Sequence, residues 1–243
     1  MENPSLLDLI LHVDHDITRH FECDYILFDA LFLALYVTLL VRHGRVAPLR
    51  AGLVCAPILY AIDGIIWTAT GVREYSLPAP WIKHPVDFVM DVSYAIVAFG
   101  WVWIAFERRS VQDVALWTAM LFAGWLAVPL ASRLFHLNDA PITTIRHMRS
   151  QVWLQIVVVV AGYLLLLALR YDLRTVLYVL WVGCMLTFMM ESALLVAQIR
   201  PSGLQVLAYE TLVLTNQGVP YVYVIWDKIL PALRKRIAAQ SAA

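Results

Sequence analysis

Charged residues are scarce in this sequence. Asp, Glu, Lys and Arg make up 15% of the 243 residues, whereas 61% are hydrophobic; a soluble domain carries about 25% charged residues. The net charge is zero, and Lys and Arg cluster only in the C-terminal tail, so the chain offers no basic surface for nucleic acid. The mean hydropathy of +0.72 instead predicts an integral membrane protein surrounded by a lipid bilayer.

Known catalytic and metal-binding signatures are also missing. The three cysteines form no C-x-x-C or zinc-type spacing, and the chain has no H-E-x-x-H, G-x-S-x-G or phosphate-binding glycine loop. Two sets of potential ligands, His12, His15 and Glu22 or Asp16 and His20, would share a face of an N-terminal helix, but an amphipathic segment on the membrane surface accounts for the same residues. We therefore expect no metal and no cofactor.

Seven apolar stretches are long enough to cross a bilayer, which takes about 20 residues. They lie at approximately 25–42, 51–71, 86–106, 114–136, 151–170, 174–198 and 205–227. The predicted fold is an all-α bundle of seven transmembrane helices, residues 25–230, between a polar N-terminal segment, 1–24, and a basic cytoplasmic tail, 231–243. The first 25 residues lack the basic and apolar regions of a cleavable signal peptide, so the first helix is expected to direct its own insertion.

The distribution of positive charge predicts the orientation of the bundle. Eleven of the 18 Lys and Arg residues follow the first, third, fifth and seventh helices. Because positive residues favour the cytoplasmic side, we expect the N-terminus outside or in a lumen and the C-terminus in the cytoplasm. The halves of the chain share no interrupted-helix repeat, which counts against a transporter.

Acidic residues inside the predicted helices are the main functional signal. A carboxylate at the bilayer centre costs about 3 kcal/mol and by default marks a functional site. Asp63 is the deepest, and Asp29, Asp91, Glu191 and Glu210 all fall on the outer side of the midplane. We infer a polar cavity that opens toward the outer side, with its floor near Asp63. The alternative is that these acids serve helix packing, to which Asp29 and Glu210 are best suited.

Aromatic and polar side chains in the outer halves of the helices are expected to line this cavity and bind a substrate. Aromatic faces stabilise cations by about 1–2 kcal/mol when desolvated, although Trp and Tyr also anchor helices at membrane interfaces. Arg133 can pair with one acid, while an acid without a cationic partner stays protonated and can act as a general acid. The expected binding residues are Tyr60, Trp67, Tyr94, Trp125, Arg133, Trp153, Asn216 and Gln217.

The layout resembles that of the transmembrane terpene cyclases of meroterpenoid and indole-diterpene pathways, such as those of pyripyropene and paspaline biosynthesis. The second helix of that family has a pattern close to Cys-Cys-Asn-x-Ala-Trp-Glu, and the stretch from Cys55 to Asp63 is similar, with Asp63 at the Glu position. The seventh helix of the family carries a second acid before Gly and aromatics, where this chain has Gln217. The resemblance implies that Asp63 protonates an epoxide on a prenyl chain and that neighbouring alkenes close the cation into rings. Glu210, Asp91 or Glu191 would then replace the second acid.

The sequence therefore predicts a terpene cyclase of the isomerase or lyase type that works by acid–base catalysis on a lipophilic, prenylated substrate. Two alternatives stay open: a membrane hydrolase or isomerase that uses the same acids on a lipid epoxide or enol ether, and a small proton-coupled transporter. The expected location is a membrane crossed several times, the endoplasmic reticulum in a eukaryote and the inner or plasma membrane in a bacterium. The candidate catalytic residues are Asp63, Asp91, Glu191 and Glu210.

Overall fold

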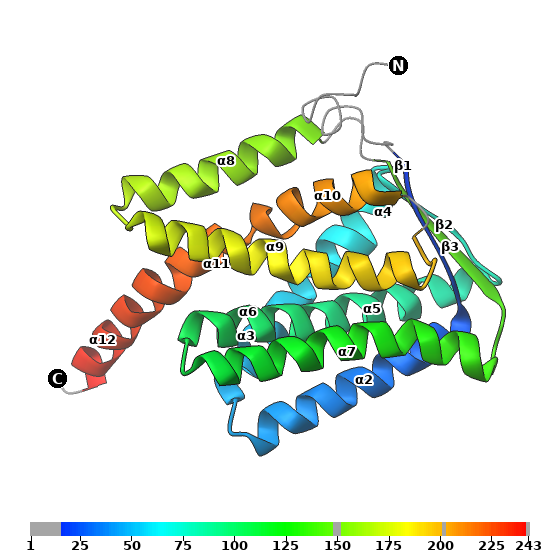
Figure 1. Cartoon of the computed structure of the whole chain (residues 1–243), viewed down its shortest axis with the longest axis horizontal. Coiled ribbons are helices and arrows are strands. Elements are labelled where there is room, and N and C mark those ends of the chain that lie inside the picture. The colour runs from blue at the N-terminus through cyan, green and yellow to red at the C-terminus, as the bar shows by residue number, and fades with distance from the viewer. Residues whose placement is uncertain (1–15, 148–151, 201–202, 242–243) are drawn as a thin grey trace.

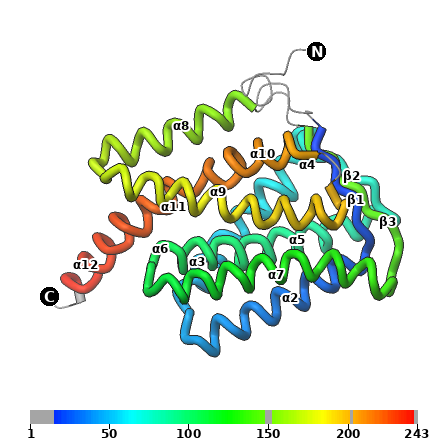
Figure 2. The backbone as a smooth tube through the Cα atoms, in the orientation of Figure 1, coloured from blue at the N-terminus to red at the C-terminus, as the bar shows by residue number. Residues whose placement is uncertain are grey.

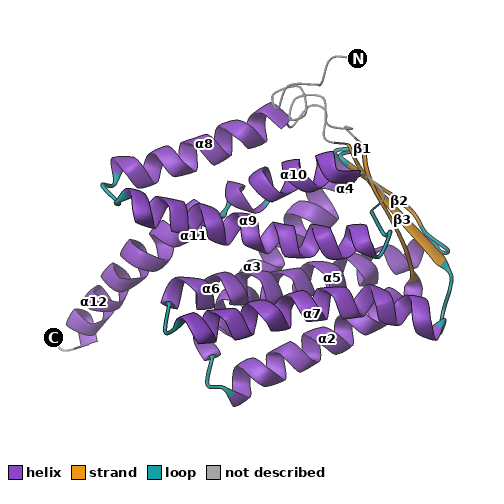
Figure 3. Cartoon of the chain, in the orientation of Figure 1, coloured by secondary structure: helices purple, strands orange, loops and turns teal. Residues whose placement is uncertain are grey.

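Long helices lie side by side through most of the molecule, and a small sheet covers one end of them (Figures 1 and 3). The computed structural model describes residues 16–147, 152–200 and 203–241. The N-terminal end of the described chain lies at the sheet, and the last helix points away from the opposite end of the bundle, as the tube in Figure 2 shows.

The helices follow the predicted apolar stretches closely. Three of them run without interruption from one end to the other: α2 (Cys23–Arg42), α7 (Val111–Phe135) and α9 (Leu173–Val196). Two further long helices are each built of several segments in series, and we call them rods. After α2, the second rod of the chain consists of α3 (Val46–Leu59), η1 (Tyr60–Ile66) and α4 (Trp67–Ala69). The third rod consists of η2 (Pro80–Ile82), α5 (Lys83–Tyr94), η3 (Ala95–Phe99) and α6 (Gly100–Glu107). The remaining helices are α8 (Val152–Ala168) and the C-terminal series α10 (Gly203–Val213), η4 (Thr215–Gln217), α11 (Val219–Val224), η5 (Ile225–Ile229) and α12 (Leu230–Ser241).

The membrane character of the chain is confirmed by the length and composition of these helices. Among the described residues, five spans are long and apolar enough to cross a membrane, and α8 is apolar but shorter. The third rod and α9 are the most buried of the five spans, so they form the centre of the bundle. The C-terminal series is broken at Gly218, next to Pro220, whose ring cannot continue a regular helix.

Three segments pair into a sheet that the sequence analysis did not predict. The strands are β1 (Asp16–Glu22), β2 (Arg73–Ser76) and β3 (Pro141–His147), antiparallel in the order β1-β3-β2. The polar N-terminal segment is therefore a strand over its described part, in place of the expected surface helix. The alternation of apolar and polar residues that is typical of a strand is hard to recognise in β1. The reason is that Arg19 occupies an inward-facing position between two buried apolar residues, Ile17 and Phe21.

The close contact between α3 and η3 depends on the absence of a side chain at Gly52. A Cβ atom there would lie 2.5 Å from the Ile96 Cα and 3.1 Å from the Ala95 carbonyl oxygen. Backbone atoms cannot move aside, so we expect Gly52→Ala to lower the free energy of unfolding by about 1–3 kcal/mol. The midpoint of thermal unfolding of the detergent-solubilised protein measures this loss.

Gly100→Ala is the matched control for that experiment. Its Cβ atom would lie 3.5 Å from the nearest Tyr36 atom, which is an ordinary contact. Because glycine inside a helix costs about 0.5–1 kcal/mol relative to alanine, this variant is expected to be at least as stable as the wild type. Equal midpoints for the two variants would contradict the role assigned to Gly52.

His147 links the three strands on the outer face of the sheet. Its Nδ1 atom donates to Asp16 Oδ1 at 2.7 Å, and its Nε2 atom lies 3.5 Å from Glu74 Oε1. The hydrogen bond to Asp16, followed by the charges of Asp16 and Glu74, raises the pKa of His147 above its ordinary value of 6.5. Since the folded pKa is higher than the unfolded one, the stabilisation is complete below pH 6.5 and is lost as the pH rises through the folded value.

We therefore expect the protein to lose a few tenths of a kcal/mol of stability, at most about 1 kcal/mol, between pH 6 and pH 8, because these groups are largely exposed. Thermal unfolding at the two pH values measures the loss, and His147→Gln should abolish the difference. A difference that persists in His147→Gln would assign the pH dependence to another group.

Candidate functional site

A cavity of about 390 Å³ lies beneath the sheet, where β1, β2 and β3 meet the helices. Its walls come from α2, η1, α5, η3, α7, α9 and the broken segment around η4. Three kinds of side chain line it: the acids Asp29, Asp63 and Asp91, the arginines Arg19, Arg73 and Arg146, and a set of aromatic and aliphatic residues. We call this the acid cavity.

The arginines reach the acid cavity because they share one face of the sheet. Arg73 and Arg146 stand opposite each other on β2 and β3, and Arg19 lies on β1 opposite Thr144. Successive side chains of a strand point to opposite faces, and these three occupy positions on the face toward the helices. The sheet thus places three positive charges over the mouth of a hydrophobic bundle.

Asp63 and Asp91 form a carboxyl pair beside Arg73. Arg73 is 8% exposed and binds Asp63 Oδ2 through its guanidinium group. Asp91, on α5, is within side-chain hydrogen-bonding reach of Asp63. Each acid has one buried oxygen atom without a donor, Asp63 Oδ1 and Asp91 Oδ2. Among the described residues Asp91 forms no ion pair, so of the two acids only Asp63 is bound by a guanidinium group.

An irregular turn of the backbone carries Asp63 to its place beside Asp91. Asp63 lies in η1, a π-helical turn inside an otherwise regular helix, and such turns are frequent at functional sites. Gly64 follows it and packs against Tyr60 and Asp87, and the Gly64 carbonyl accepts a hydrogen bond from Lys83 Nζ at 2.8 Å. Lys83 also binds Asp87 at 2.9 Å, so these two groups hold η1 against the start of α5.

Asp29 is a third acid in the lining. It is 6% exposed, and its Oδ1 atom accepts a hydrogen bond from the Ser93 hydroxyl at 2.8 Å. No arginine or lysine among the described residues forms an ion pair with it. The acid cavity therefore contains one carboxyl group held by a hydroxyl and two held next to a guanidinium group.

A second group of charges lies beside the cavity and is buried, and only its Arg146 also belongs to the cavity lining. Arg146 binds Glu210 at 2.5 Å, and Arg200 binds Glu191 at 2.5 Å and approaches Glu210 to 3.8 Å. All four side chains are at most 7% exposed. This network joins the sheet to α9 and α10, with Arg146 common to the network and the cavity.

The part of the acid cavity farther from the sheet is apolar and aromatic. Tyr94 and Trp125 stack with ring centroids 6.4 Å apart and an interplanar angle of 13°. Leu59 lies one helical turn before Asp63, and Phe99 lies two turns beyond Asp91, on the side away from the sheet. The cavity therefore combines charged groups under the sheet with a hydrocarbon-like interior.

Six of the predicted site residues do line the acid cavity. They are Asp63, Asp91, Trp67, Tyr94, Trp125 and Gln217. The prediction that Asp63 forms the floor is wrong, because Leu59 and Phe99 continue the cavity beyond it. Trp67 has Arg73 and Arg146 over its ring, at 5.9 and 5.7 Å from the centroid, so its face is already occupied by cations.

The other six predicted residues lie elsewhere. Glu191 and Glu210 are absent from the lining because Arg200 and Arg146 bind them. Asn216 is fully buried and bonds to Tyr163 and to the Leu212 carbonyl.

The remaining three belong to the outside of the bundle. Tyr60 bonds to His84 at 3.1 Å, Arg133 is exposed, and Trp153 is 63% exposed. Arg133 forms none of the ion pairs found in the described part of the chain, so its expected pairing with an acid is also wrong.

The cavity-lining residues that sequence reasoning missed are mainly the sheet arginines, together with Tyr25, whereas the Ser93 hydroxyl was expected in the cavity. Arg19, Arg73 and Arg146 were assigned to outer loops and used only to predict orientation. The sequence feature that marks such a residue is an arginine at an inward-facing position of a short stretch in which inward and outward positions alternate, such as Ile17-Thr-Arg-His-Phe21. That signal becomes readable only when the strands are known to pair over the acids.

The proposed N-terminal metal ligands do not form a site in the described chain. His12 and His15 lie outside the described residues, while Asp16 and His20 point away from the helices and bond to His147 and Thr143. Glu22, His136 and Asp139 have ligand atoms within 4.8 Å of one another at an exposed corner. They lie outside the acid cavity lining.

Comparison with known proteins adds no identification: no protein family, curated protein or solved structure matches this chain. The acid cavity itself must therefore support any functional assignment.

Proposed function

We propose that this chain is an integral membrane terpene cyclase that protonates an epoxide or alkene of a lipophilic prenylated substrate in the acid cavity. The observation that carries the proposal is the Asp63–Asp91 pair, in which one acid is bound by Arg73 and the other is not, facing a hydrophobic, aromatic interior. General acid catalysis needs a positioned proton donor shielded from bulk water, and this arrangement supplies one.

Asp91 is the proton donor in this scheme and Asp63 is the group that positions it. Arg73 binds Asp63, whereas Asp91 forms no ion pair among the described residues, so we assign the role of donor to Asp91. This assignment differs from the one implied by the sequence resemblance, in which Asp63 itself donates. Tyr75 supports Arg73, whose Nη1 atom donates to the Tyr75 hydroxyl at 3.3 Å.

The reaction balances without any added reactant. Asp91 transfers its proton to the epoxide oxygen, the C–O bond breaks, and the oxygen leaves as a hydroxyl group on the same molecule. The resulting carbocation takes the electron pair of a neighbouring alkene, which forms a ring bond. Loss of a proton from the final cation to the Asp91 carboxylate restores the enzyme, so substrate and product are isomers.

The lining also suggests how the substrate is oriented. Tyr94 and Trp125 present aromatic rings to the middle of the cavity, where ring faces stabilise a developing cation. Arg19 forms no ion pair within the described part of the chain, which leaves its guanidinium available to a polar end of the substrate under the sheet. The hydrocarbon chain then extends toward Leu59 and Phe99.

The membrane arrangement belongs to the same proposal. We place seven spans in the bilayer, with the sheet on the outer or luminal side and α12 in the cytoplasm, because Lys and Arg are more frequent at the end away from the sheet. The membrane is that of the endoplasmic reticulum in a eukaryote, or the inner or plasma membrane in a bacterium. The partners are the bilayer and a lipophilic small molecule.

The test is conversion of epoxidised prenyl compounds of several chain lengths by the purified protein in lipid vesicles. A cyclase yields products of unchanged mass and, in water labelled with heavy oxygen, incorporates no label when the cation is quenched by deprotonation. Incorporation of one labelled oxygen would support the hydrolase alternative. No protein-dependent loss of any epoxide would contradict both.

The interior of the bundle does not favour the transporter alternative. Between the acid cavity and the far end, the described core is mostly apolar, with residues such as Val97, Trp101 and Leu186, and its buried polar residues Thr187 and Asn216 are uncharged. The next buried charged side chain in the described chain is Arg45, which binds Glu107 and Asp113 at the end of the bundle. An alternating-access path needs polar groups that reach both faces.

A further inference from the structure

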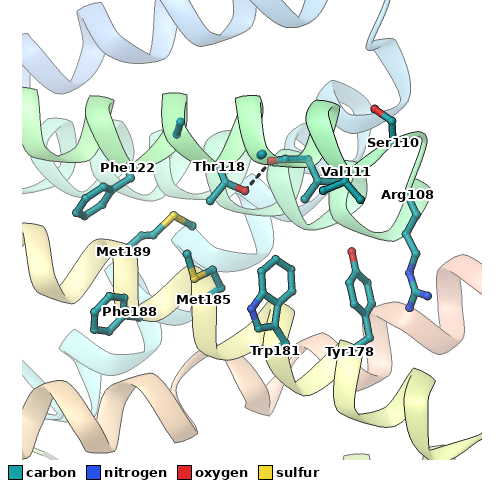
Figure 4. Close-up of a pocket in the computed structure, with 13 residues that line it drawn as sticks. Arg108, Ser110, Val111, Thr118, Phe122, Tyr178, Trp181, Met185, Phe188 and Met189 are labelled. Atoms are coloured by element: carbon teal, nitrogen blue, oxygen red, sulfur yellow. Dashed lines mark hydrogen bonds between the residues drawn. The ribbon is translucent and has the colours of Figure 1, made fainter.

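A second cavity lies between α7 and α9, toward the end of the bundle away from the sheet. Its volume is about 580 Å³, and its walls come from the first half of α7, the facing side of α9 and the turn before α7. Figure 4 shows Trp181 and Met185 projecting from α9 toward α7, with Phe122 and Phe188 at one end and Arg108 at the other. We call this the lateral groove.

The lateral groove is apolar over most of its length and open toward the surroundings of the helices. Phe122, Trp181 and Phe188 are between 38% and 45% exposed. The hydroxyl groups in its lining are already satisfied: Thr118 donates to the Val114 carbonyl at 2.7 Å and accepts from Trp101 Nε1 at 3.0 Å. Tyr178 donates to the Ala105 carbonyl at 2.7 Å, and Ser110 accepts from the Asp113 backbone N–H at 3.0 Å. The groove therefore suits a hydrocarbon chain better than a polar molecule.

One positively charged side chain, Arg108, lies at the end of the groove opposite Phe122. The Arg108 guanidinium stacks over the Tyr178 ring, 3.5 Å from its centroid. The nearby acids Glu107 and Asp113 are bound by Arg45, and Arg108 forms no ion pair in the part of the chain that the structure describes. Arg108 is therefore a positioned cation that forms no ion pair with any described acid.

The spacing between the two ends matches one leaflet of a bilayer. From Val111 to Phe122 the groove follows α7, and at 1.5 Å per residue this distance is about 17 Å. Half of a hydrocarbon core of about 30 Å is about 15 Å. A lipid with its headgroup at the membrane surface beside Arg108 would thus reach the bilayer centre at Phe122 and Phe188.

We propose that the lateral groove is a specific binding site for an anionic glycerophospholipid, with one acyl chain along α7 and α9 and the phosphate bound by Arg108. The unpaired cation at the headgroup level selects an anionic lipid over a zwitterionic one. This proposal does not depend on the cyclase reaction, because the groove and the acid cavity have no lining residue in common.

The test uses Trp181, which lines the groove, as a reporter of brominated acyl chains. The protein is reconstituted in phosphatidylcholine vesicles that contain a minor fraction of phosphatidylglycerol or phosphatidylcholine with brominated chains. The Trp181 signal is the difference between the wild type and Trp181→Phe. We expect brominated phosphatidylglycerol to quench Trp181 with about fivefold higher relative affinity than brominated phosphatidylcholine, since one basic group near the surface has an effect of that size.

Two variants separate the charge from the groove. Arg108→Gln should make the two brominated lipids equivalent, whereas Ala119→Phe should reduce quenching by both because its ring fills the groove. Leu116→Phe is the control, since Leu116 is exposed on the same helix but does not line the groove. Ala115→Phe, at a second lining position, replaces Ala119→Phe if that variant does not fold.

Equal quenching by the two lipids in the wild type would show only non-selective lipid contact and would overturn the proposal. Phosphatidylglycerol selectivity that survives in Arg108→Gln would also overturn it.

Discussion

Asp91→Asn is expected to reduce cyclisation by about 10³-fold, within the range that loss of a general acid produces. The asparagine amide can still donate a hydrogen bond to Asp63, so the carboxyl pair keeps its geometry, but the amide has no proton to give to an epoxide. The expected pattern is a fall in kcat with little change in KM, because proton transfer occurs only in the transition state. Turnover of an epoxidised prenyl substrate by the purified variant measures both constants.

Asp87→Asn is the matched control for this prediction. Asp87 lies one turn before Asp91 on α5 and is also buried, but it binds Lys83 and is absent from the acid cavity lining. It should retain activity within about tenfold of the wild type. Full activity of Asp91→Asn would remove Asp91 from the mechanism, and an equal loss in the two variants would indicate a general disturbance of α5.

Arg200→Gln is expected to lower the free energy of unfolding by about 3–5 kcal/mol, the cost of breaking a buried ion pair by removing one partner. Arg200 is 3% exposed and approaches both Glu191 and Glu210, so its loss leaves two buried carboxylates with a single cation, Arg146. The shift of the thermal midpoint in detergent measures the effect. Because Arg200, Glu191 and Glu210 lie outside the cavity lining, the activity of the protein that remains folded should change much less than its stability.

Two comparisons test that this loss comes from uncompensated charge. Arg109→Gln removes an arginine whose pair with Glu107 is largely exposed, and such pairs contribute about 0–1 kcal/mol. The double variant Arg200→Gln with Glu191→Gln removes one charge of each sign and should recover a substantial part of the stability lost in Arg200→Gln. No recovery in the double variant would mean that the packing of the Arg200 side chain, rather than its charge, is what matters.

The helices of this protein could be predicted because a helix in a bilayer satisfies its own backbone hydrogen bonds. The position of an apolar run is then readable from local composition alone. The run from Leu173 to Val196 illustrates this, since the predicted range of 174–198 nearly coincides with α9. The acids inside these helices could be located for the same reason, and Asp63 and Asp91 were correctly expected to share a cavity.

The partners of those acids were decided by contacts between segments far apart in the chain. Arg73 and Arg146 are 73 positions apart in the sequence and face each other across β2 and β3, and neither short strand has an apolar pattern strong enough to reveal the pairing. Local composition alone therefore determined the membrane helices and the acids that lie inside them. Only the tertiary structure decided which acids are bound to arginine and which of them share a cavity, because charge pairing depends on distances of a few ångströms that sequence separation does not encode.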